Sequence, residues 1–133
     1  MNKEEGIKLL LEQVSNFNNR YNHAFGQTML RLDDGSYLMS NENLMLTSIK
    51  EEDIKQYTAG SGIIGKIFRR RHDINAIVFA CTEASIEFSN THTALYPSLM
   101  DLAETVGSKV RVINGMSARS LLKATKEIDA CII

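Results

Sequence analysis

The chain has 133 residues and a mass of 14.9 kDa, the size of one domain with its own hydrophobic core. Hydrophobic residues make up 44% of it, and 15 Lys and Arg balance 16 Asp and Glu, which excludes a general attraction to nucleic acid or to anionic membranes. The polar first residues and the lack of an apolar run of membrane-spanning length predict a soluble, cytoplasmic protein.

The first predicted element is an amphipathic helix. Asn2 and Glu5 have the spacing of a capping box, in which each side chain accepts a hydrogen bond from the other residue's backbone. Apolar residues then recur every three or four positions and give the helix one apolar face: Ile7, Leu10, Val14, Phe17 and Tyr21. The polar run at 18–20 weakens the helix toward its end.

A hairpin is predicted next. Residues 28–32 and 37–39 have strand character and flank the sequence Asp33-Asp34-Gly35-Ser36. Asp-Gly is a strong signal for a tight turn with positive φ. A polar loop at 40–43 follows the second strand.

Two helices are expected after the hairpin. Ser48 and Glu51 have capping-box spacing, so we expect a short helix that runs to Tyr57. The start of the following helix is made flexible by three glycines, Gly60, Gly62 and Gly65. This second helix buries four apolar residues and ends in a basic run, in order Ile63, Ile64, Ile67, Phe68 and then Arg69-Arg70-Arg71-His72.

The run Ala-Ile-Val-Phe-Ala-Cys at 76–81 is typical of a strand that is covered on both faces. Both cysteines, Cys81 and Cys131, lie in apolar runs, where free thiols act as small core residues. Two cysteines do not make a disulfide framework, which favours a reducing compartment.

The second half of the chain alternates strands and helices. Its elements are a helix with Pro97 in the first turn and Gly107 at the C-terminal cap, a strand at 110–113, a turn at Asn114-Gly115, a helix from Ser117 and a strand at 130–133. This alternation predicts an α/β sheet covered by helices in a single domain, residues 1–133. A terminal strand with an uncovered edge pairs readily with another chain, so we expect a homo-oligomer.

Several segments, in this order and spacing, together resemble the class II aldolase/adducin family. They are Gly26-Gln27-Thr28-Met29-Leu30-Arg31, Asp34-Gly35, Leu38-Met39-Ser40, Glu52-Asp53-Ile54 and Arg71-His72-Asp73-Ile74-Asn75-Ala76-Ile77-Val78, with further matches at 100–107 and 126–130. The resemblance implies a three-layer α/β/α fold about a mixed, largely antiparallel sheet. The chain matches only the first part of a typical family domain, so part of that sheet is expected to be absent or supplied by a neighbouring subunit.

The resemblance also implies a metal site, and this chain lacks its ligands. Aldolases of the family bind zinc or another divalent metal through a His-x-His pair directly after the buried strand. The matching positions here are Phe79-Ala80-Cys81, where Phe79 cannot bind a metal and Cys81 is a single soft donor. The family's third His lies in a later segment with no counterpart before Ile133. We therefore expect no metal and no other cofactor.

The family's acid/base and phosphate residues are replaced as well. The Glu of its Ser-Ser-Glu motif moves the proton, and the matching positions hold Thr58-Ala59-Gly60, where glycine offers no titratable group. Its phosphate loop reads Ser40-Asn41-Glu42-Asn43 here, and the charge of Glu42 opposes a bound anion. The polar groups that remain define a candidate pocket for a small, polar, neutral ligand: Gln27, Ser40, Asn43, Thr58 and Cys81.

Other features have a structural and a functional interpretation. His23 and His92 lack neighbours at metal-ligand spacing, and His72 lies at a helix end where a cation is favourable, so all three are expected on the surface. The run 69–71 with Lys66 is either a solvated helix end or a polyanion site, and the absence of interleaved aromatic residues argues against nucleic acid. Cys81 near Glu83 has no neighbouring His to activate it as a nucleophile, and Gly60-Ser61-Gly62 lacks the Lys of a P-loop.

Two functions follow from the sequence. The first is a non-catalytic protein of the aldolase fold that acts as an oligomeric scaffold or as a binding module for a small ligand or a protein. The alternative is a divergent metal-dependent aldehyde-lyase, acting on a sugar phosphate through an altered site that includes Cys81.

Overall fold

The computed structural model describes residues 1–17, 24–126 and 128–133. They form two compact units, Met1–Thr82 and Glu83–Ile133, and each unit is described by itself. Tyr21, the polar run at 18–20 and His23 lie outside the described residues. The prediction of a single domain over residues 1–133 stays a prediction.

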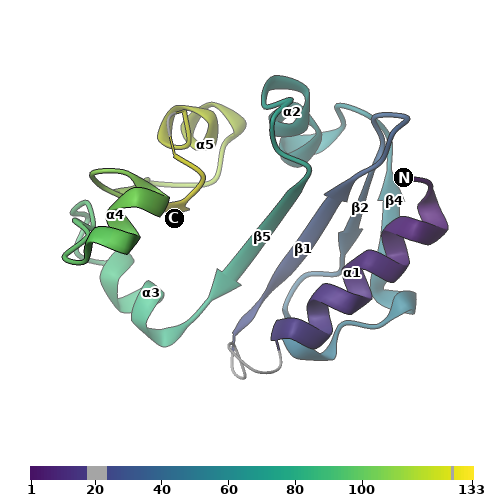
Figure 1. The fold of residues 1–133 in the computed structure, drawn as a ribbon, viewed down its shortest axis with the longest axis horizontal. Helices are drawn as coiled ribbons and strands as arrows, with labels where there is room; N and C mark the ends of the chain where they lie inside the picture. Colours follow the sequence, from purple (N-terminus) through teal and green to yellow (C-terminus); the bar gives the residue numbers. More distant parts are fainter. Residues whose placement is uncertain (18–23, 127) are drawn as a thin grey trace. The chain divides into compact units, whose positions relative to one another are not determined.

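The first unit is a five-stranded antiparallel sheet with helices α1 (Lys3–Phe17) and α2 (Gly62–Arg70). Strand β1 pairs with β2 and β3 as well as with β5, and β2 pairs in turn with β4 (Figure 1). The strands are β1 (Phe25–Arg31), β2 (Tyr37–Ser40), β3 (Leu44–Met45), β4 (Ile54–Tyr57) and β5 (Ala76–Cys81).

Local sequence signals form the first helix and the hairpin as predicted. The Asn2 backbone N–H donates to Glu5 Oε2 (2.9 Å), and the Glu5 N–H donates to Asn2 Oδ1 (3.0 Å), which completes the capping box. In the turn between β1 and β2, Gly35 has a φ of 79° and the Ser36 N–H donates to Asp34 Oδ1 (2.9 Å). The hydrogen bonds that Ser36 donates lower the pKa of Asp34.

Helix α1 packs on one face of the sheet and closes the hydrophobic core (Figure 1). Leu10 and Val14 of the helix are buried against Leu30 and Leu38 of the sheet. Gly6 makes the approach close, because a Cβ there would lie 2.9 Å from side-chain atoms of the sheet. The other buried members of the core are Ala24, Leu32, Leu46, Ile49 and Ile54.

The predicted helix from Ser48 to Tyr57 is wrong. The chain instead makes two 3₁₀ turns, Leu46–Ser48 and Glu51–Asp53, and then strand β4. The Ser48 hydroxyl donates backward to the Met45 carbonyl (3.0 Å) rather than capping a helix. Strand β4 forms because Ile54 completes the core while Tyr57 pairs with Tyr37 of β2 across the ladder.

Strand β5 is found where it was predicted, but it is not covered on both faces. Every residue of β5 is exposed or half-buried, with Val78 47% exposed. Among the described residues β5 pairs only with β1, so it forms an edge of the sheet. Cys81, expected to be a core thiol, is exposed for the same reason, and Cys131 is half-buried.

The second unit contains α3 (Glu83–Ser89), α4 (Met100–Val106), β6 (Arg111–Val112), α5 (Ala118–Ala124) and β7 (Cys131–Ile132). Strands β6 and β7 form a separate parallel pair. The helix predicted from Ser117 is confirmed as α5, and the Ser117 hydroxyl caps it by accepting from the Ser120 N–H (3.1 Å). The preceding helix starts at Met100, so Pro97 precedes it rather than occupying its first turn. No helix in the described part of the chain is long and apolar enough to cross a membrane.

Candidate functional site

Two of the five predicted pocket residues, Gln27 and Ser40, meet where β1 and β2 stop pairing. The Gln27 side-chain amide donates to the Ser40 carbonyl (3.0 Å), and the Thr28 backbone N–H donates to Ser40 Oγ (3.1 Å). Ser40 is only 1% exposed. These two polar side chains therefore satisfy the backbone at the end of the ladder, as buried polar groups require.

Register places two further candidates at the same end of the sheet. Asn43 directly precedes Leu44, which pairs with Gly26 of β1, and Cys81 pairs with Phe25. Asn43 is exposed and holds a positive φ of 60°. Thr58, by contrast, follows the end of β4 that pairs with Tyr37, so it lies at the opposite end of the sheet.

The position of the family's histidine pair does not fit a divalent metal. Phe79 and Cys81 share one face of β5, because alternate strand residues point the same way. A half-buried phenyl ring therefore stands where the first imidazole would be, and a lone thiol stands at the second. Within the described ranges no three His, Cys, Asp or Glu side chains gather to hold a metal. His72 and His92 are exposed.

Gly26 is needed for packing at this site. A Cβ at this position would lie 1.8 Å from the Phe79 carbonyl oxygen. Only glycine permits so close an approach of β1 and β5. The glycine of the resemblance motif is thereby explained by strand packing alone.

The position of the family's catalytic Glu lies in a tight turn before α2. Gly60 has a φ of 70°, and the Thr58 carbonyl accepts from the Ser61 N–H (3.1 Å) and from the Ser61 hydroxyl (2.7 Å). The Arg69 guanidinium lies directly over Gly60, 1.8 Å from where a Cβ would be. The Arg69 side chain therefore fills the space that a side chain at position 60 would need.

The start of α2 packs closely against the turn that precedes it. A Cβ on Gly65 would lie 2.6 Å from the carbonyl carbon of Gly60, so the turn rests directly on the helix. The basic run is also partly neutralised, because Arg71 donates to both carboxylate oxygens of Asp73 (2.9 and 3.1 Å from Nε). These hydrogen bonds lower the pKa of Asp73 to about 2.

Sequence reasoning missed the central role of Arg31. Its guanidinium donates to the carbonyls of Phe68 (2.8 Å), His72 (2.9 Å) and Ile74, and to Asn75 Oδ1 (3.0 Å). It also lies over the Phe68 ring, 5.5 Å from the centroid. The signal available in the sequence was an Arg between two apolar residues, Leu30 and Leu32.

Comparison with known proteins identifies the fold. No protein-family model and no curated protein sequence matches the chain. The L-fuculose-1-phosphate aldolase of Thermus thermophilus matches with a TM-score of 0.72 at 19% identity, over 96% of this chain and 74% of that one. YgbL of Escherichia coli gives 0.68 at 15% identity, over 88% and 68% of the two chains. An aldolase II superfamily protein from Pseudomonas syringae gives 0.56 at 14%, over 98% and 62%.

The chain is thus an α/β protein with a largely antiparallel sheet of the class II aldolase type. The resemblance found in the sequence is confirmed at the level of the fold. At these identities the likeness establishes the fold alone, and chemistry has to be argued from the residues of this chain.

Proposed function

We propose that this chain is a non-catalytic protein of the class II aldolase fold, which acts as an oligomeric scaffold or a binding module for a small polar ligand or a protein partner. One observation carries the proposal: the positions for metal and proton transfer hold Phe79, Cys81 and Gly60. Neither a phenyl ring nor a glycine under an Arg69 guanidinium replaces an imidazole or a carboxylate.

The proposal includes the three-layer α/β/α arrangement, a cytoplasmic location and self-association. Exposed strand β5 supports self-association, because its outer backbone groups have no strand partner among the described residues. Light scattering of the purified chain after size exclusion tests this part. A single species at the mass of one chain at micromolar concentration contradicts it.

The rival function is a metal-dependent aldehyde-lyase that uses Cys81. Its support is the exposure of this thiol at the end of β5, where it is open to a metal or to a group from another subunit. Two of the solved structures with this fold are L-fuculose-1-phosphate aldolases, and their substrate is therefore the one to test.

The experiment combines retro-aldol turnover with metal content. Tag-free protein is equilibrated with zinc or manganese, passed through a desalting column, and assayed for cleavage of L-fuculose 1-phosphate and for bound metal. We expect background turnover and less than stoichiometric metal. Turnover that disappears on chelation and in Cys81→Ser, but persists in the control Cys131→Ser, establishes the rival instead.

A further inference from the structure

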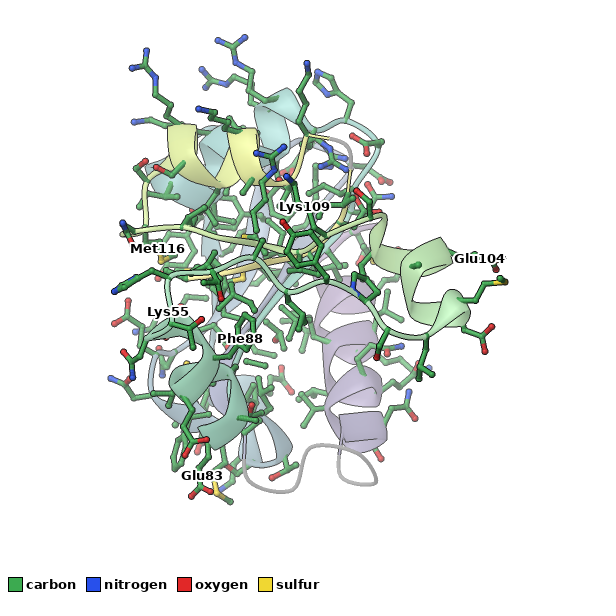
Figure 2. All side chains as sticks on the ribbon, turned by 90° about the vertical axis from the view of Figure 1, so that its left-hand side faces the viewer. Lys55, Glu83, Phe88, Glu104, Lys109 and Met116 are labelled. Atoms are coloured by element: carbon green, nitrogen blue, oxygen red, sulfur yellow. The ribbon has the colours of Figure 1, made fainter. Side chains whose placement is uncertain are left out.

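A pocket of 380 Å³ lies within the second unit, between β6 with its following loop and helix α5. Its volume is that of a site for a small molecule. Lys109, one of its lining residues, lies beside α5 in Figure 2, where α5 is the yellow helix. None of the five residues predicted for a ligand pocket lines it, so it is an unassigned cavity.

Two cationic residues of the segment around β6 line this pocket. Lys109 and Arg111 are two positions apart and therefore share one face of the strand. Val110 between them is 6% exposed and points the other way. The Leu95 and Val110 backbones hold this segment in place, with an N–H···O hydrogen bond in each direction (2.9 and 2.8 Å).

Helix α5 adds a third cation and a hydroxyl. Ser120 and Lys123 are three positions apart, which places them next to each other on one helix face. Ala124, only 3% exposed, provides an apolar part of the wall. Ser120 Oγ accepts from the Ser117 hydroxyl (2.8 Å), so its own hydrogen is left to donate to a ligand.

The pocket is consequently cationic without compensation. Of the residues that the structure describes, the lining contains Lys109, Arg111 and Lys123 and no carboxylate. Among the described residues none of these three cations forms an ion pair. Three like charges that converge on one concavity repel each other, and an anion bound between them removes this cost.

We propose that this pocket binds the phosphate group of a small molecule. Three cations match a phosphate dianion better than a carboxylate monoanion, and the Arg111 guanidinium offers two parallel donors to phosphate oxygens. Asn114 and Ser120, which also line the pocket, add neutral donors. The inference goes beyond the proposed function and holds whether or not the chain is catalytic.

The test is calorimetric titration of the full chain with inorganic phosphate at low ionic strength, beside Arg111→Gln and the control Arg119→Gln. Arg119 is exposed on the same helix as Lys123, outside the pocket lining, and its substitution changes net charge equally. We expect saturable binding that Arg111→Gln weakens about tenfold, equal to about 1.4 kcal/mol. Arg119→Gln is expected to weaken it less than about twofold, because only screened long-range charge is lost.

Three results overturn the proposal. The first is an equal loss in both variants, which reduces binding to net charge. The second is acetate binding as tightly as phosphate, and the third is no saturable binding of phosphate. Far-UV circular dichroism verifies the fold of each variant, and Lys123→Gln, at an exposed helix position, gives a second measure of the loss should Arg111→Gln unfold. None of these readouts involves aldolase turnover, so this proposal and the proposed function fail separately.

Discussion

Replacement of Arg31 is expected to loosen the segment that joins α2 to β5. The guanidinium ties β1 to three backbone positions, the carbonyls of Phe68, His72 and Ile74. Arg31→Met keeps a long apolar side chain but removes every donor. The three carbonyls then lose their charged partner and depend on water.

The magnitude follows from the geometry. A hydrogen bond to a charged group contributes about 1.5–3 kcal/mol when buried, but Arg31 is only half-buried, so about 1 kcal/mol for each of three carbonyls is appropriate. The cation–π contact with Phe68 adds about 0.5 kcal/mol. We expect Arg31→Met to lower the free energy of unfolding by about 3.5 kcal/mol. Arg31→Lys, which keeps the charge and one or two donors, should cost about 2 kcal/mol.

Urea unfolding followed by far-UV circular dichroism measures both variants. Arg70→Met is the matched control, because Arg70 is exposed on α2 and Arg and Met have similar helix propensities. The control should change the free energy of unfolding by less than about 0.5 kcal/mol. A cost for Arg31→Met below about 1 kcal/mol, or equal to that of the control, refutes the reasoning.

Three further outcomes are expected. Gly65→Ala should lower the free energy of unfolding by about 2 kcal/mol through overpacking, because a Cβ at this position lies 2.6 Å from the backbone of the preceding turn. Gly62→Ala should lower it by about 1 kcal/mol, because Gly62 has a φ of 59°. Equal losses of the two variants in urea unfolding contradict this. The pKa of Asp73 is about 2, below its ordinary value of 3.8. The ionised carboxylate therefore stabilises the folded state fully above pH 3.8, and this contribution is lost as the pH falls through 2. An NMR titration of Asp73 with a midpoint near 3.8 would contradict this. Iodoacetamide should label exposed Cys81 before half-buried Cys131, whose pKa burial raises; mass spectrometry showing equal rates would disprove it.

Elements governed by short-range signals could be predicted from the sequence. The Asn2 capping box and the Asp-Gly turn each depend on residues two or three positions apart, and each is present. The rest of the fold could not be obtained in this way. Strand β4 depends on pairing with β2, which is distant in the sequence. In the 3₁₀ turn before it, Asp53 Oδ2 accepts from the Lys50 N–H (2.9 Å), and this local hydrogen bond resembles one at the start of a helix.

The prediction that β5 is buried was wrong with a larger consequence, because composition alone does not distinguish a central strand from an edge strand. Its apolar run predicted cover on both faces, yet the register assigns it one partner among the described residues. That error extended to the site, where Cys81 was assigned both to the core and to a pocket. The structure makes it an exposed thiol.

The candidate pocket shows how far resemblance extends to chemistry. Gln27 and Ser40 were selected as polar groups that remain where the resemblance implies a ligand pocket, and the structure does bring them together. Yet the contact joins an amide to a backbone carbonyl, and the Ser40 hydroxyl accepts from a backbone N–H, so both groups serve the end of a strand ladder. A ligand bound there has to displace these hydrogen bonds, whereas the three cations of the second-unit pocket have no ion pair to lose among the described residues. By this energetic criterion the cationic pocket is the better place to look for a ligand.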